Sequence, residues 1–466
     1  MAAAQALTQT TRLLTNIILA SLLVPADFGL VAIATIISAF LDQIKDMGTG
    51  SAVIQRKNLS HGVLNAIFAL NVVVGFCLAA LMFGFAAPLA SLFGSPAATS
   101  VIQAYALITV VTAFGQIHHA LLRRELRFGA VASIGALTAV VTAIVSIGLA
   151  AMNFGVWSLV LGYGLASLAG TVSVWMLDSW RPSGRVSWDE LRPIVGYSTN
   201  LMFANLCGFF LLHSDSFLVG RYLGSGPLGI YAFAQRILTY PLSTIANVVG
   251  EVVFPVFSHK QDDDAALRSG FIRTNRVVAL VTFPVMAGAA TIARPAVDVL
   301  FGPSWEDLIP LIWILGPVGA LQSVTFTTSP MLMAKGRSDL MLRWLFISGV
   351  VCVAAYIIGL RWGLVGVAGS YAVAIVILTP FNLMIAFHPI GLRLRTYAKD
   401  LLPQVAITLA MVGAVLLTSV LVGQVAGQAV VLVAGVLVGV LSYGALLWLI
   451  RPAVIGDALI GLRRRG

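Results

Sequence analysis

The chain has 466 residues, of which 59% are hydrophobic and only 10% charged, and its formal net charge is +10. A soluble globular chain carries about 25% charged residues, so this composition excludes an ordinary soluble domain. Apolar stretches of about 20 residues recur from end to end, and each is long enough to cross a bilayer as a helix. We therefore predict an all-α polytopic membrane protein with about 14 transmembrane helices.

The predicted helices follow one another with short breaks at glycine, proline and charged residues. They cover residues 4–24, 28–46, 62–87, 98–122, 129–152, 154–178, 193–220, 227–257, 270–293, 306–334, 338–360, 363–388, 402–423 and 428–450. Two shorter apolar stretches, 88–94 and 295–302, are expected to lie at the membrane interface. No stretch remains for a soluble catalytic domain.

Lysine and arginine are concentrated in alternate loops between these predicted helices. If the N-terminus is cytoplasmic, most of the 28 basic residues fall in loops on the cytoplasmic side. Such an asymmetry sets the orientation of membrane proteins. The positive charge therefore predicts that both termini are cytoplasmic, and it does not indicate a nucleic-acid partner. The basic tail GLRRRG is expected to contact anionic membrane lipids.

Two pairs of segments indicate an internal repeat. The stretch ILASLLVPADFGLVAIATII (18–37) aligns without a gap on LVGRYLGSGPLGIYAFAQRI (218–237), and FGVWSLVLGYGLA (154–166) resembles WGLVGVAGSYAVA (362–374). The repeat predicts four regions, which are an N-terminal six-helix lobe (1–180), a cytoplasmic linker (181–192), a C-terminal six-helix lobe (193–390), and two additional helices with the basic tail (391–466). Because six is even, both copies begin on the same side of the membrane.

Polar side chains within the spans are the candidates for function, because a charge in hydrocarbon is costly and usually faces a cavity or a partner. Helical periodicity places several of them on single faces. The first helix carries Gln5, Gln9, Arg12 and Asn16, the second Thr35, Ser38, Asp42, Lys45 and Thr49, and the eighth Arg236, Tyr240, Ser243, Asn247 and Glu251. The seventh helix contributes Asp215 less regularly.

A functional and a structural interpretation compete for these residues. Arg12 and Arg236 can offer paired donors to a diphosphate, and the neutral stripe residues can offer hydrogen bonds and an aromatic surface to sugar. Asp215, Glu251, Asp42 and Lys45 are candidates for coupling or gating. Alternatively, Arg12 forms an interhelical ion pair with Asp215 or Asp42, and Asp42 and Lys45 form an ordinary surface ion pair.

Two further polar clusters are expected to be structural. His118 and His119 adjoin LLRRELRF and are predicted to lie at the membrane interface, since no residues nearby complete a metal site. The run from Asp262 to Asp264 is predicted to be a solvated helix start, where a carboxylate interacts favourably with the helix dipole.

The segments DFGLVAIATII, GTGSAVIQRKNL, LLRRELRF, FGVWSLV, VGRYLGSGPLGIYAFAQRI and VVFPVFS together resemble the polysaccharide flippases of the multidrug/oligosaccharidyl-lipid/polysaccharide exporter superfamily. The resemblance covers roughly residues 5–390. It implies a fourteen-helix fold with two six-helix lobes in a V, whose first, second, seventh and eighth helices line a central cavity. It also implies export of undecaprenyl-diphosphate-linked oligosaccharide repeat units across a bacterial inner membrane, with a polysaccharide polymerase as a further partner.

Two other functions remain as alternatives. A cation-coupled drug exporter of the same superfamily would favour buried acidic residues over cavity arginines, and a membrane glycan polymerase or ligase would need a large outer loop. Every outer loop predicted here is short. No nucleotide-binding Walker motif is present, so we expect that ATP is not the direct energy source. We expect a transporter rather than an enzyme, with no cofactor and no metal.

Overall fold

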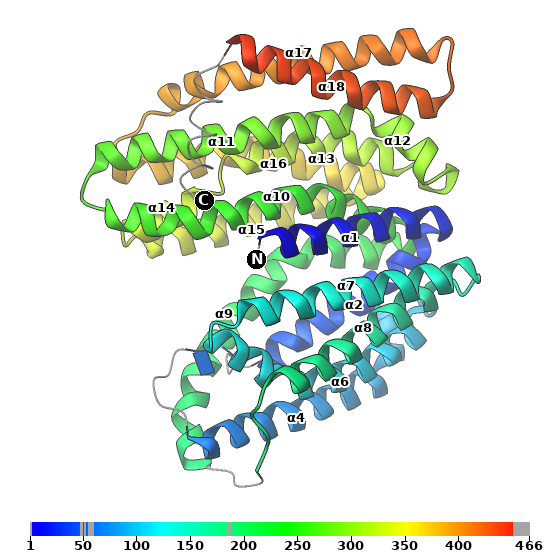
Figure 1. The fold of residues 1–466 in the computed structure, drawn as a ribbon, viewed down its shortest axis with the longest axis vertical. Helices are drawn as coiled ribbons and strands as arrows, with labels where there is room; N and C mark the ends of the chain where they lie inside the picture. The colour runs from blue at the N-terminus through cyan, green and yellow to red at the C-terminus, as the bar shows by residue number, and fades with distance from the viewer. Residues whose placement is uncertain (1, 47–49, 51–52, 55–59, 184–187, 451–466) are drawn as a thin grey trace. The chain divides into compact units, whose positions relative to one another are not determined.

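The structure is a computed structural model that describes the backbone of residues 2–46, 50, 53–54, 60–183 and 188–450. Within these ranges the chain is helical and contains no strand. The chain packs as two compact units, residues 1–232 and 233–466, which are described separately below. Figure 1 shows the helices of both units.

The first unit is built around α6. Its helices are α1 (Ala2–Leu22), α2 (Pro25–Asp46), α4 (His61–Gly84), α5 (Ala86–Leu92), α6 (Ala98–Arg124), α7 (Phe128–Ala151), α8 (Val156–Leu177), α9 (Trp188–Leu223) and the start of α10 (Ser225–His259). Helix α6 packs against α2, α4, α5, α7 and α8, while α1 lies on α7 and α9 lies on α2 and α4. Polar side chains on α6 are therefore held inside a bundle.

The second unit continues α10 and ends in a helix pair. It contains α11 (Asp264–Thr291), α12 (Ala293–Leu300), α13 (Leu308–Ser323), α14 (Thr328–Ala334), α15 (Ser338–Gly359), α16 (Gly363–Phe387), α17 (Leu394–Gly423) and α18 (Gln428–Ile450), with short 3₁₀ turns at Pro303–Trp305, Leu360–Trp362 and His388–Ile390. Helices α17 and α18 pack on each other, α17 also packs on α11, and α18 packs on α12. Arg276 of α11 forms an ion pair with Asp400 of α17, which fixes this attachment.

All fourteen predicted helices are found, and the two predicted interfacial stretches correspond to α5 and α12. Among the described residues, nine helices are long and apolar enough to cross a membrane, or ten if the bent pair α11 and α12 counts as one span. The prediction of about fourteen spans is compatible with these helices. The predicted helix 306–334 is interrupted between α13 and α14. Pro330 lies in the first turn of α14, where its missing N–H costs no helical hydrogen bond.

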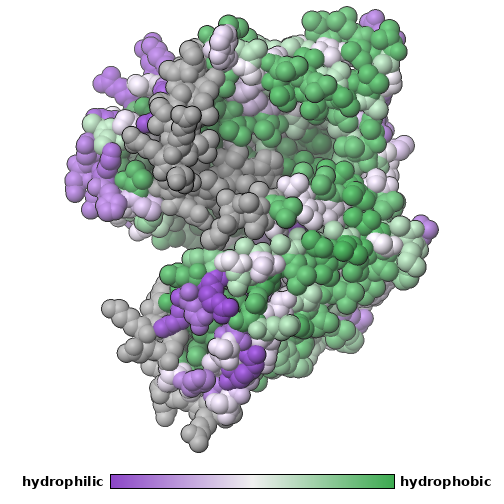
Figure 2. Space-filling view, in the orientation of Figure 1, coloured by the Kyte–Doolittle hydropathy of each residue, from purple (hydrophilic) through white to green (hydrophobic). Residues whose placement is uncertain are grey.

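The exterior is hydrophobic over most of the face in view. Figure 2 shows mostly apolar residues on the right of the view, with hydrophilic residues gathered near the left-hand ends of α11 and α14 and in a second patch on the left of the first unit. Large apolar side chains such as Leu212, Leu417 and Leu441 are exposed along the helices. A surface of this kind is suited to lipid, since a soluble monomer rarely exposes large apolar patches. The protein is a multi-pass membrane protein.

Two glycines support the repeat seen in the sequence. Gly155 precedes α8 with φ of 54°, and Gly363 begins α16 with φ of 67°. The two positions are 208 residues apart, which is the offset of the aligned segments. A positive φ is a conformation that glycine adopts without steric cost, so both copies begin their sixth helix with the same local turn. The lobe boundaries stay a prediction, because the two compact units divide within α10.

The aspartate run begins a helix as predicted. Asp263 caps α11, and its Oδ1 accepts hydrogen bonds from the backbone N–H groups of Ala265 and Ala266 at 3.0 and 2.9 Å. A capping carboxylate satisfies donors that the first helical turn leaves unpaired. This confirms the structural interpretation of the run.

Candidate functional site

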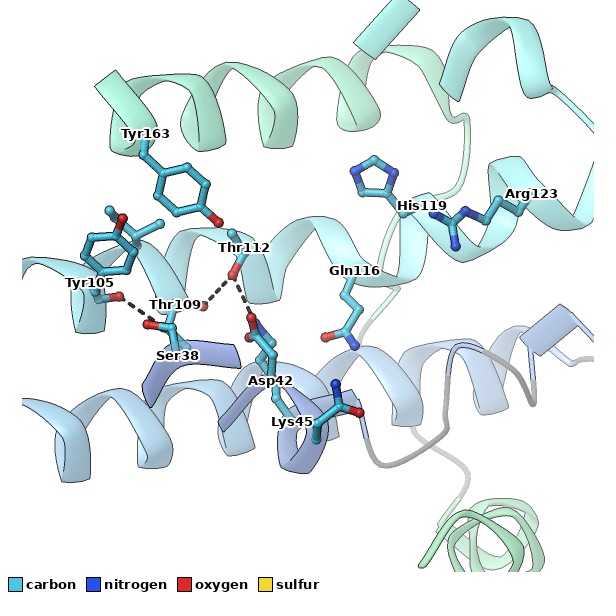
Figure 3. A pocket seen from close by; sticks show the side chains of 12 residues that line it. Ser38, Asp42, Lys45, Tyr105, Thr109, Thr112, Gln116, His119, Arg123 and Tyr163 are labelled. Atoms are coloured by element: carbon cyan, nitrogen blue, oxygen red, sulfur yellow. Dashed lines mark hydrogen bonds and ion pairs between the residues drawn. The ribbon is translucent and has the colours of Figure 1, made fainter. Parts of the chain in front are cut away.

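A polar cavity of about 660 Å³ lies inside the first unit, between α2, α6 and α8. Its lining residues are Ser38, Asp42, Gln43, Lys45, Tyr105, Ile108, Thr109, Thr112, Gln116, His119, Arg123 and Tyr163. Figure 3 shows the two tyrosines at one end, His119 and Arg123 at the other, and Asp42 and Lys45 between them. The volume falls in the range of about 300–1,000 Å³ that is usual for small-ligand sites.

One face of α6 supplies half of this lining. Six polar residues alternate at spacings of four and three along the helix, namely Tyr105, Thr109, Thr112, Gln116, His119 and Arg123. This spacing keeps side chains on one face of an α-helix. The spacing of this stripe is visible in the sequence, but the stripe is not among the predicted ones, because Thr, Gln and Tyr stand out less than charged residues in an apolar helix.

An ion pair between Asp42 and Lys45 lies in the middle of the cavity. Lys45 Nζ lies 2.6 Å from Asp42 Oδ1 and donates a hydrogen bond of 3.0 Å to Thr112 Oγ1 of α6. The side chain of Lys45 is 6% exposed and that of Asp42 is 49% exposed. The expected ion pair is therefore present, but the surface interpretation is wrong for Lys45, whose ammonium group is buried. Burying an ammonium is costly unless it is paired and hydrogen-bonded.

Two stacked tyrosines form the end of the cavity that lies away from His119 and Arg123. The rings of Tyr105 and Tyr163 are nearly parallel, with centroids 5.4 Å apart and an interplanar angle of 15°. Thr35 donates a hydrogen bond of 3.5 Å to the Tyr105 hydroxyl. Arg12 of α1 and Asp42 are both close enough to Tyr163 to interact with it electrostatically. Two of the predicted stripes, on α1 and α2, thus converge on this region.

The predicted polar residues of α1 lie outside the lining of this cavity, as far as their side chains are described. The side chain of Arg12 is exposed, and Asn16 donates a hydrogen bond of 2.8 Å to the backbone carbonyl of Arg12. Gln9 is partly buried, and its Oε1 has no hydrogen-bond partner in the described part of the chain. The side chain of Gln5 lies outside the described residues. None of these three described residues lines the cavity itself.

The stripe on α10 belongs mostly to the second unit. The side chain of Arg236 is exposed. The side chains of Tyr240, Ser243, Asn247 and Glu251 lie outside the described residues, although the helix that carries them is described. That Arg12 and Arg236 face one cavity stays a prediction.

Asp215 is buried, and its described partners are not arginines. The Tyr231 hydroxyl donates a hydrogen bond of 3.0 Å to Asp215 Oδ2, and the Ser216 backbone N–H donates one of 2.6 Å to Oδ1. Within the described ranges, no ion pair joins Arg12 to Asp215 or to Asp42. The structural alternative for Arg12 therefore finds no support in this geometry.

The main surprise in the first unit is a buried pair between His118 and Asp178. His118 Nδ1 lies 2.6 Å from Asp178 Oδ2, and the two side chains are 0% and 2% exposed. The rings of Trp175 and Trp180 enclose the imidazole at centroid distances of 4.6 and 5.4 Å. His118 is therefore enclosed by protein, and its position at the membrane interface stays a prediction. Its partner is 60 residues away in the chain, so no local pattern reveals the pair.

The His118–Asp178 pair fixes the segment that follows α8. Arg181 donates hydrogen bonds of 2.7 Å to the carbonyls of Asp178 and Trp175, and its guanidinium lies 5.6 Å above the Trp175 ring. Asn65 of α4 donates to Ser183 Oγ at 2.7 Å and accepts from the Ser183 N–H at 3.2 Å. The beginning of the predicted linker is thus bonded to α4 and to the end of α8.

Metal ligands are not gathered in this unit or elsewhere in the described ranges. No group of three or more His, Cys, Asp or Glu side chains there could hold an ion. The cavity chemistry therefore consists of hydroxyl, amide, aromatic and charged groups. Such groups can bind a polar organic ligand through hydrogen bonds and charge.

Comparison with known proteins gives the family. The family described as "Polysaccharide biosynthesis protein" matches residues 18–310. The lipopolysaccharide biosynthesis protein WzxC of Escherichia coli (strain K12) is 27% identical over 392 residues, which are 82% of this chain and 79% of WzxC. The teichuronic acid biosynthesis protein TuaB of Bacillus subtilis (strain 168) is 25% identical over 384 residues, which are 80% of this chain and 78% of TuaB.

A solved structure gives the fold. The lipid II flippase MurJ in an inward closed conformation superposes with a TM-score of 0.76 at 15% identity, covering 97% of this chain and 99% of that one. The predicted fold class, an all-α polytopic membrane protein, is confirmed. With a match to well over half of its length, the chain belongs to the polysaccharide biosynthesis protein family.

Proposed function

We propose that this protein is a flippase that moves undecaprenyl-diphosphate-linked oligosaccharide repeat units across a bacterial inner membrane by alternating access, for polysaccharide biosynthesis. Family membership, the MurJ-like fold and the biosynthetic roles named for WzxC and TuaB support this function. The observation that carries it is the polar cavity of about 660 Å³ inside a helical unit with an apolar exterior. An oligosaccharide needs such an environment, because its hydroxyl groups lose water when they cross hydrocarbon.

The charged residues have separate roles in this proposal. Arg12 and Arg236 bind the diphosphate, since guanidinium presents paired donors to phosphate oxygens. Gln5, Gln9, Asn16, Tyr240, Ser243 and Asn247 contact the sugars. Asp215, Glu251, Asp42 and Lys45 act in coupling or gating. Both termini and the 181–192 linker face the cytoplasm, and a polysaccharide polymerase receives the exported units.

Transport in vesicles tests the function. The purified protein is reconstituted with a fluorescent polyprenyl-diphosphate oligosaccharide, and a membrane-impermeant reagent quenches the label on the outer leaflet. We expect the protein to increase the quenched fraction with time, relative to vesicles without protein. A protein that leaves the glycolipid in place but moves a cationic dye along an ion gradient would be a drug exporter, and the proposal would be wrong.

A further inference from the structure

The Asp42–Lys45 ion pair is unusual in how unevenly its two members are buried. Lys45 is almost inaccessible and is held by Thr112 Oγ1 of the neighbouring helix, whereas the Asp42 carboxylate is half exposed. The ammonium therefore has one fixed partner on the protein side and one replaceable anion on the cavity side. A buried ammonium needs an anion nearby, but nothing in this geometry requires that anion to be Asp42.

Asp42 can leave Lys45 without any helix moving. It lies one turn before Lys45 on α2, so a change of its side-chain rotamer separates the two charged groups. Since the carboxylate is already half exposed, it loses little by turning fully into water. The buried Lys45 ammonium cannot become solvated in this way, so another anion has to replace Asp42 when Asp42 leaves.

The surroundings of Lys45 suit a phosphate that is joined to a sugar. Arg123 lines the same cavity, and its guanidinium makes the end of the cavity beyond Lys45 favourable for negative charge. From Thr112 to Tyr105 is seven residues, or about 10 Å along α6, which brings a ligand that starts at Lys45 to the stacked tyrosines. Their apolar ring faces fit the C–H face of a sugar, while Thr109 and Ser38 can bond its hydroxyl groups.

We propose that this cavity is a sugar-phosphate subsite. In the ligand-free protein, the Asp42 carboxylate pairs with Lys45 in the place that the ligand's phosphate takes on binding. The ligand's phosphate displaces Asp42 from Lys45 on binding, and Asp42 returns when the ligand leaves. The exchange keeps the buried ammonium neutralised in both states. This inference rests on the proposed function, because it assigns the glycolipid's first sugar and attached phosphate to the cavity of the first unit. It gives Asp42 and Lys45 a binding role instead of coupling or gating, and it leaves the second phosphate of the diphosphate to Arg12 and Arg236.

Binding measurements on two variants test the exchange, because it and a purely structural pair predict opposite signs. The protein in lipid nanodiscs is titrated with a hexose 1-phosphate by calorimetry. Asp42→Asn removes the competing anion and should tighten binding severalfold. Lys45→Met removes the phosphate partner and should weaken binding at least about tenfold, as expected for a charged hydrogen bond. A structural pair would instead give Asp42→Asn a weaker or unchanged affinity.

A second Lys–Asp pair in the chain supplies the control. Lys335 Nζ lies 2.7 Å from Asp264 Oδ1, a distance close to that of the cavity pair, and Asp264 is also half exposed. Asp264→Asn and Lys335→Met should leave hexose 1-phosphate binding unchanged. If Lys45→Met fails to fold, the sign of the Asp42→Asn effect still decides the question, and a weakened or unchanged affinity overturns the exchange.

Other ligands identify the source of the phosphate. A methyl hexoside without phosphate should bind equally to the wild type and Asp42→Asn. A polyprenyl diphosphate without sugar that shows the Asp42→Asn gain, while hexose 1-phosphate does not, would assign the site to the lipid headgroup alone and overturn the sugar subsite. Glycolipid transport by the same preparations separates the two proposals. If the protein transports glycolipid but Asp42→Asn does not tighten hexose 1-phosphate binding, only the exchange is refuted. If Asp42→Asn tightens binding but the protein transports no glycolipid, only the flippase function is refuted.

Discussion

Gly29 of α2 and Gly229 of α10 face each other's helix at a reciprocal contact. A Cβ atom on Gly29 would lie 1.7 Å from the carbonyl oxygen of Ser225, and one on Gly229 would lie 1.9 Å from the carbonyl oxygen of Pro25. Pro25 and Ser225 are 200 residues apart, as are the two glycines. Repeat-related segments therefore contact each other through equivalent atoms, as in an isologous interface. The two aligned segments, 18–37 and 218–237, thus pack against each other through a symmetric contact.

This contact predicts that neither glycine tolerates a side chain. Gly229→Ala should lower the melting temperature, because a backbone carbonyl cannot move aside as a flexible side chain can, and overpacking costs about 1–3 kcal/mol. Gly29→Ala should behave alike. Gly208→Ala in α9 is the control, since a Cβ there meets nothing within 4 Å. Thermal unfolding in detergent measures all three, and equal melting temperatures would show that the crossing is looser than described.

The His118–Asp178 pair predicts a large loss of stability when one member is removed. His118→Ala should destabilise the protein by about 3–5 kcal/mol, since it leaves a buried carboxylate without its partner. Glu125→Gln provides the comparison, because the Glu125–Arg127 pair at the end of the same helix is exposed, with a separation of 3.7 Å. That change should cost about 1 kcal/mol or less. Similar unfolding curves for the two variants would contradict a structural role for the buried pair.

How far the sequence predicts this protein depends on the range of the interactions. The helices are specified locally by apolar runs, so their order and approximate ends were predictable, and so was the α2 stripe that brings Ser38, Asp42 and Lys45 to one cavity. The burial of Lys45 could not be predicted, because it depends on α6 covering the face of α2 that carries Lys45. His118 shows the same limit more strongly, since its environment is created by a carboxylate and two indole rings at and beyond the end of α8, about 60 residues along the chain.

Membrane orientation gives a prediction that is independent of any substrate. In a variant without native cysteines, Ser60→Cys should react only with reagents that enter the cytoplasm, and Gln424→Cys should react with an impermeant maleimide added outside. Both residues are exposed and lie in connections between helices. The expectation follows from the excess of lysine and arginine in the loops on one side. Reaction of both positions from the same side would contradict the predicted arrangement of spans and the cytoplasmic termini.

The last prediction concerns Arg12 and Arg236, the two arginines assigned to the diphosphate. A lipid diphosphate carries negative charge into surroundings of low dielectric, where a guanidinium offsets the cost of its desolvation. Arg12→Ala or Arg236→Ala should therefore reduce glycolipid transport by about tenfold or more, while the protein still folds and inserts. Lysine should restore transport only in part, because a point charge replaces a forked donor.

The controls separate this role from a structural one. Arg361→Ala removes an exposed arginine from the 3₁₀ turn between α15 and α16 and should leave transport unchanged. Since Asp215 accepts hydrogen bonds from Tyr231 and Ser216, Asp215→Ala should not rescue Arg12→Ala. If it does rescue transport, or if Arg12→Ala has no effect, Arg12 belongs to an interhelical ion pair formed in another state of the transport cycle. Its assignment to the substrate would then be wrong.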